Sequence, residues 1–172
     1  MNTALYGTIW IALGLFCAGE AGRRHIHVGR LTAPWAWWAF SVGALLCTIH
    51  VVIAMSLTHG WNHDAAAAAT ARQTMAVYGL NWGGGVYVNY AFVGVWWLDA
   101  WRWRRFPSRD GRRARVVTWT TRVFFIVIIL NAAVIFASGT RRIAGVLIVL
   151  WLFWIWRPEA ARESALTSSA SD

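Results

Sequence analysis

The side chains able to bind a ligand are concentrated between residues 49 and 99. Three of the five histidines, His50, His59 and His63, lie in this stretch, and Asp64 directly follows the last of them. Imidazole suits zinc, copper and iron. Two hypotheses follow: a haem iron bound by His50 with His59 or His63, or a transition metal bound by the histidines with Asp64. His59 and His63 are four residues apart, so they would share one face if that segment is helical.

A second set of polar side chains lies within apolar runs and comprises Asn81, Asn89, Asp99 and Asn131. At about 1.5 Å per helical residue, His50, Asn81 and Asn131 each lie roughly 9–10 Å inside one end of their runs. Asn81 and Asp99 are 18 residues apart, which is about five helical turns. Polar groups inside a bilayer tend to face other helices and to mark sites. We therefore expect His50, Asn81 and Asn131 to form one polar level.

Three functions are open for this polar level. In the first, the polar groups hydrogen-bond across helices, and the protein is a non-catalytic accessory, scaffold or assembly subunit of a larger membrane complex. In the second, it is a haem- or metal-binding subunit for electron transfer or metal-dependent chemistry. In the third, it binds or transports a small solute or a lipid head group, although a transporter normally contains an internal repeat and this sequence shows none.

We favour the first function, because the motifs that carry chemistry are missing from the sequence. It contains no Cys-x-x-Cys-His or His-Glu-x-x-His motif, which haem attachment and zinc proteases use. Its serines lack the Gly-x-Ser-x-Gly setting of a nucleophile. Asp64 and Asp99 are expected near opposite membrane faces, so they do not form a pair for acid–base catalysis. The sequence therefore does not indicate an enzyme, and it requires no cofactor.

The composition indicates a protein of the lipid bilayer. Of its 172 residues, 58% are hydrophobic and 13% are charged, whereas soluble domains are about 45–50% apolar and about a quarter charged. The net charge of +9 comes from 16 basic residues, all arginine, in short clusters between apolar runs. A nucleic-acid-binding protein would instead need a contiguous basic face. We therefore expect no nucleic-acid partner.

Five apolar runs predict an all-α integral membrane protein, a bundle of five transmembrane helices. The predicted spans are residues 4–18, 34–57, 75–98, 117–137 and 143–156. They form one domain, residues 1–157, before a polar tail at 158–172 that we expect to be disordered and cytoplasmic. The last run is short, because about 20 residues cross a bilayer. Four spans with an interfacial or re-entrant C-terminal helix are the alternative.

The arginines predict the orientation. Three follow the first run, one follows the second, seven follow the third and two follow the fourth. Cytoplasmic loops carry the excess of basic residues, so the N-terminus is outside and the C-terminus is cytoplasmic. Arginine-only usage and many alanines indicate a bacterium, and hence the inner membrane. Anionic lipid head groups are the expected partners of Arg102, Arg104, Arg105, Arg109, Arg112, Arg113 and Arg115.

Local signals predict further details. The alanine-rich residues 65–73 favour a helix, either an interfacial one or an extension of the next span, with Asn62 or Asp64 as its N-cap. Pro34 suits the start of the second span. Gly79 and Gly83 have the spacing that lets helices pack closely in lipid. Glu20 lies beside the first arginines, which predicts an exposed ion pair worth about 0–1 kcal/mol.

Overall fold

The computed structural model describes residues 3–27, 34–106 and 112–157, which are helical throughout except at turns and contain no strand. The elements are α1 (Thr3–His27), α2 (Pro34–Ile53), η1 (Ala54–Thr58), α3 (His63–Tyr78), α4 (Gly85–Arg105), α5 (Arg112–Leu130), η2 (Asn131–Ile135) and α6 (Thr140–Ile155). The π-helical turns η1 and η2 continue α2 and α5. The predicted all-α fold is confirmed over these residues, and the described part of α2 begins at Pro34.

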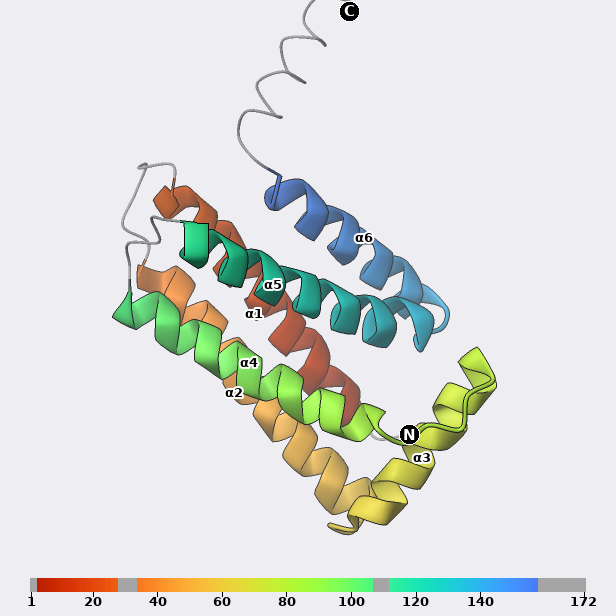
Figure 1. The fold of residues 1–172 in the computed structure, drawn as a ribbon. Helices are drawn as coiled ribbons and strands as arrows, with labels where there is room; N and C mark the ends of the chain where they lie inside the picture. The colour runs from red at the N-terminus through yellow and green to blue at the C-terminus, as the bar shows by residue number, and fades with distance from the viewer. Residues whose placement is uncertain (1–2, 28–33, 107–111, 158–172) are drawn as a thin grey trace, which may run out of the picture.

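Helices α1, α2, α4, α5 and α6 run alongside one another and form a bundle, and α3 crosses one end of it (Figure 1). α1 packs most extensively on α2; α4 contacts α2 and α5, and α6 contacts α1 and α5. Successive helices of the bundle run in opposite directions (Figure 1). The end where α1, α4 and α6 finish is called the Glu20 end, and the end that bears α3 is called the His50 end.

Aromatic rings fill the middle of the bundle. The Phe16 ring centroid lies 5.1 Å from that of Trp96 and 5.2 Å from that of Phe125, and both pairs are nearly perpendicular. Such edge-to-face pairs are favourable beyond the area they bury. Phe40 and Phe92 complete the group, at 5.7 Å and 5.5 Å from Trp96. These rings separate the polar groups at the two ends of the bundle.

Two glycines allow neighbouring helices to approach closely. A Cβ atom added to Gly22 of α1 would lie 2.3 Å from Ala36 Cβ of α2. One added to Gly145 of α6 would lie 2.0 Å from the backbone oxygen of Ala133 in η2. Both distances are too short for real atoms, so larger side chains would force these helices apart.

The third apolar run differs from its prediction. Gly79 has φ +69° and ends α3, with its N–H bonded to the Met75 oxygen, and α4 begins only at Gly85. A Cβ atom on Gly83 would lie 2.6 Å from the backbone oxygen of Ala67. The prediction of one helix over 75–98 is therefore wrong. Gly79 and Gly83 serve a turn and its contact with α3, not the packing of two transmembrane helices.

The predicted helix before this turn is confirmed. α3 covers residues 65–73 and is capped by the Asn62 side chain, which accepts a 3.0 Å hydrogen bond from the Ala65 N–H. Asp64 lies in its first turn, where a negative charge interacts favourably with the helix dipole and stabilises the helix. The cap is local, since donor and acceptor are three residues apart.

Within the described parts of the chain, two helices are long and apolar enough to cross a membrane, Pro34–Thr58 and Arg115–Ile135. α1 extends to His27, nine residues beyond the predicted end of the first span. α6 has 16 residues rather than the predicted 14. The tail predicted to be disordered, 158–172, lies outside the described residues.

Candidate functional site

Charged side chains are buried together at the Glu20 end. Glu20, Arg23 and Asp99 are 2%, 4% and 3% exposed. Arg23 Nη1 donates to Glu20 Oε1 and to Asp99 Oδ2, at 2.7 Å each. Arg122 Nη2 lies 3.9 Å from Glu20 Oε2. These four residues are called the ion cluster. The prediction of an exposed Glu20 pair is wrong, because other helices cover this face of α1.

The ion cluster draws its members from several helices. Glu20 and Arg23 are three residues apart on α1, which places them on one face. Asp99 comes from α4 and Arg122 from α5. α6 joins through its C-cap residue Trp156, whose Nε1 donates to Glu20 Oε2 at 2.8 Å. The contacts of the ion cluster therefore connect four helices, α1, α4, α5 and α6.

Aromatic rings surround the two guanidinium groups. Arg23 Cζ lies 4.2 Å from the Trp103 ring centroid and 4.9 Å from that of Phe40, which brings α2 into the same site. Arg122 Cζ lies 5.3 Å from the centroid of Trp156. Cation–π contacts of this kind strengthen when the cation is desolvated. All five helices of the bundle thus contact the ion cluster, α6 through its C-cap residue Trp156.

The charges of the ion cluster balance. Its two carboxylates and two guanidinium groups sum to a formal charge of zero. A buried pair offsets the cost of leaving water only when its geometry and hydrogen bonds are good, and removing one partner leaves an uncompensated buried charge. Arg23 Nε and Nη2 have no hydrogen-bond partner among the described residues. Arg23 therefore depends on Glu20 and Asp99 for its compensation.

The residues of the polar level predicted at the His50 end lie in different settings. His50 Nδ1 lies 3.3 Å from Thr8 Oγ1 of α1. Asn131 Oδ1 accepts a hydrogen bond from the Tyr78 hydroxyl, and its Nδ2 donates to Val127 O at 2.7 Å. Asn81 is exposed in the segment between α3 and α4. It lies outside a helix because Gly79 ends α3, so the depth predicted for Asn81 does not apply.

The remaining predicted polar residues separate as well. Asn89 is exposed on α4, whereas Asp99, near the other end of the same helix, is buried in the ion cluster. The predicted alignment of Asn81 with Asp99 along one helix is wrong, since α4 begins after Asn81. Of the predicted site residues, only Asp99 belongs to the ion cluster.

The segment from His59 to His63 is not one helix, so the condition for the two histidines to share a helical face is not met. His59 follows η1, and His63 begins α3. The chain turns between them at Trp61, which has φ +60°. His63 Nδ1 lies 3.4 Å from the Tyr90 hydroxyl. Within the described ranges, no three His, Cys, Asp or Glu side chains are placed to hold a metal ion, so the set His59, His63 and Asp64 does not fit one.

Sequence reasoning missed most of the ion cluster. Glu20 and Arg23 carried one readable signal, their spacing of three residues, but it does not reveal that Asp99 and Arg122 cover the pair. Comparison with models of protein families, with curated proteins and with solved structures finds no match to this chain. Its function is therefore inferred from its contacts.

Proposed function

We propose that the chain is a five-span protein of the cell membrane, with its N-terminus outside and its C-terminus in the cytoplasm. The apolar surface supports this. Only 33% and 17% of the most apolar stretches of the two membrane-capable helices are buried within the protein. On the other helices, Leu98 is 59% exposed and Leu147 is 62% exposed. Soluble monomers rarely expose large apolar surfaces, whereas a bilayer would cover these side chains.

The arginines support the orientation. Arg102, Arg104 and Arg105 end α4 at the Glu20 end, and the positive-inside rule assigns such a cluster to the cytoplasm. In a bacterium the membrane would be the inner one. α6 is the short member: its 16 residues span about 24 Å of a core about 30 Å thick. Local thinning of the bilayer or flanking side chains make up such a mismatch at modest cost.

Within that membrane, the protein acts as a non-catalytic accessory, scaffold or assembly subunit of a larger complex. The observation that carries this proposal is the ion cluster, whose charged groups bind one another and hold five helices in one arrangement. The aromatic rings between the two ends favour a closed interior over a solute pathway. A rigid bundle with a large apolar exterior is suited to packing against other membrane proteins.

The test is isolation from native membranes. The chain, tagged at its C-terminus and expressed at its natural level, would be extracted into polymer-bounded lipid discs and analysed by native electrophoresis and mass spectrometry. We expect a particle that contains a second polypeptide at fixed stoichiometry. A variant carrying Asp64→Asn, at an exposed position, should retain that polypeptide, and Asp99→Asn should lose it.

Three results would contradict the proposal. The first is a chain that is always isolated alone. The second is a chain that stays in solution without detergent or lipid, which would reject the membrane location itself. The third is a purified protein with a stoichiometric haem or transition metal, which would favour the haem- or metal-binding subunit instead.

A further inference from the structure

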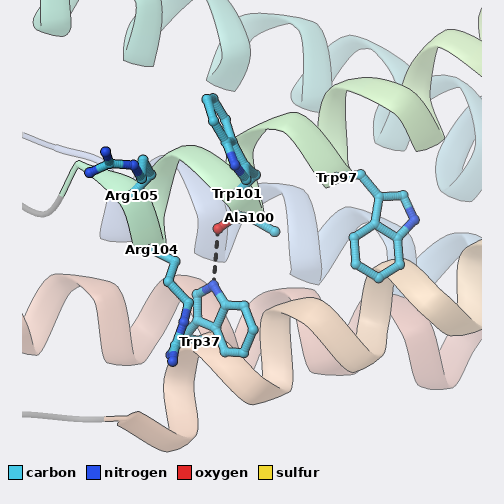
Figure 2. Close-up of a pocket in the computed structure, with 6 residues that line it drawn as sticks. All are labelled: Trp37, Trp97, Ala100, Trp101, Arg104 and Arg105. Carbon is cyan, nitrogen blue, oxygen red and sulfur yellow. Dashed lines mark hydrogen bonds between the residues drawn. The ribbon is translucent and has the colours of Figure 1, made fainter.

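A cavity of about 330 Å³ lies between α2 and α4 near the Glu20 end. It is lined by Trp37, Trp97, Ala100, Trp101, Arg104 and Arg105 and is called the tryptophan groove. Figure 2 shows Trp37 pointing from α2 to α4, with Arg104 alongside its ring. The Arg104 Cζ atom lies 4.8 Å from the Trp37 ring centroid. The groove is therefore aromatic, with guanidinium groups at one end.

The indole N–H groups of two wall residues are already bonded. Trp37 Nε1 donates to the Ala100 carbonyl oxygen at 2.9 Å, and Trp97 Nε1 donates to Thr48 Oγ1 at 3.0 Å. These bonds hold both rings in place. Arg104 already lies over the Trp37 ring, so the exposed apolar surface left for a ligand is mainly that of Trp97 and Trp101, which are 40% and 57% exposed. Such apolar ring surfaces bind hydrocarbon chains.

The charged groups of the groove favour an anion. Arg104 and Arg105 are both exposed in the last turn of α4, and planar guanidinium groups match the oxygens of a phosphate. The six lining residues include no carboxylate, so a head group that carries an amine would meet two cations without a counter-charge. A phosphate with net negative charge is favoured over a zwitterionic one.

The position of the groove selects the source of the phosphate. Tryptophans gather at the level of lipid head groups, where one part of the ring is apolar and another is wet. The tryptophan groove lies at the end of α4 that carries the arginines, beside surfaces that a bilayer would cover. A molecule with a phosphate next to hydrocarbon chains fits both parts at once.

We propose that the tryptophan groove binds one anionic phospholipid, with its phosphate at Arg104 and Arg105 and its hydrocarbon along Trp37, Trp97 and Trp101. The proposal rests on the membrane location proposed above. It goes further, because it names one bound lipid and its site where charge alone would predict a diffuse attraction to the whole arginine cluster.

The experiment is native mass spectrometry of the detergent-purified protein, incubated with equal amounts of phosphatidylglycerol and phosphatidylethanolamine. The wild-type protein should retain one phosphatidylglycerol selectively. In the double variant Arg104→Gln/Arg105→Gln, the preference for phosphatidylglycerol should fall about tenfold or more, since each arginine contributes to the free energy of binding an anionic lipid. The matched control is Arg115→Gln, at an exposed arginine of the same end that lies outside the groove.

Three outcomes would overturn the inference. Equal retention of the two lipids by the wild type would remove the preference. An equal loss in the Arg115→Gln control would mean a diffuse charge effect. Displacement of phosphatidylglycerol by millimolar inorganic phosphate would mean that the site takes a free anion rather than a lipid. Any of these, in a protein that still requires detergent, rejects the lipid site and leaves the proposed membrane location intact.

A second measurement separates loss of binding from loss of folding. Tryptophan fluorescence should be quenched more by brominated phosphatidylglycerol than by brominated phosphatidylcholine, and the double variant should abolish the difference. Its thermal unfolding should match that of the wild type in detergent without added lipid, because both arginines are exposed. Quenching that is equal for the two lipids in the wild type would reject the site.

Discussion

The two ends of the bundle hold their polar groups in opposite ways. At the Glu20 end, charged side chains of three helices contact one another and are shielded by aromatic rings. At the His50 end, hydrogen-bonding contacts join Thr8 with His50, Tyr78 with Asn131, and Tyr90 with His63. A buried charge needs a counter-charge, whereas a polar group at the surface can also hydrogen-bond to water. We infer that tertiary stability is concentrated at the Glu20 end.

The sharpest way to break this comparison is the substitution Asp99→Asn. It keeps the shape of the side chain but leaves Arg23 and Arg122 opposite Glu20 alone. Removing one partner of a buried ion pair costs about 3–5 kcal/mol, and we expect a loss of that size in the free energy of unfolding, measured by SDS titration in mild detergent. The matched control, Asp64→Asn at the exposed start of α3, should cost less than about 0.5 kcal/mol.

A double variant tests whether charge is the reason. Replacing a buried pair by apolar side chains of similar volume is often neutral, so Arg23→Met combined with Asp99→Leu should recover much of the stability that Asp99→Asn loses. If the double variant were less stable than Asp99→Asn, packing rather than electrostatics would explain the ion cluster. Equal losses for Asp99→Asn and Asp64→Asn would mean that the two ends do not differ.

The features predicted correctly from the sequence depend on neighbouring residues. The α3 cap, for example, follows from a hydrogen bond between two residues that are three apart. The ion cluster has no such local origin: Arg23 and Asp99 are 76 residues apart, and Trp156 and Glu20 are 136 apart. Their contacts depend on how whole helices are placed, which composition and periodicity do not specify.

The third apolar run shows a second reason. Leu80 and Trp82 keep it apolar across the break between α3 and α4, so hydropathy predicts one continuous span. The break depends on Gly79, which adopts φ +69°, a conformation that glycine reaches without steric cost. The glycine pattern in the sequence is ambiguous, because glycines occur both where helices pack closely and in turns. Because one continuous helix is predicted, Asn81 is expected inside it, at the depth of His50 and Asn131.

A smaller effect is expected from Asn62→Ala at the His50 end. Loss of an N-cap side chain costs about 1 kcal/mol, and here the loss should stay within α3. Hydrogen exchange should accelerate roughly fivefold over residues 63–78 and remain unchanged in α4. Asn89→Ala, at an exposed position of α4, should alter neither helix. Faster exchange at the Glu20 end would mean that the two ends unfold together and would remove the contrast between them.

The smallest effect is expected from His50→Ala, which also decides between the structural and the haem or metal interpretations of that histidine. An interhelical hydrogen bond averages about 0.6 kcal/mol, and a double-mutant cycle with Thr8→Val should return a coupling of that size. The absorption spectrum and metal content of protein expressed with haem and metals available should be the same for wild type and variant. A Soret band or stoichiometric metal that disappears in His50→Ala would make the His50 end the reactive part of the molecule and the ion cluster its support.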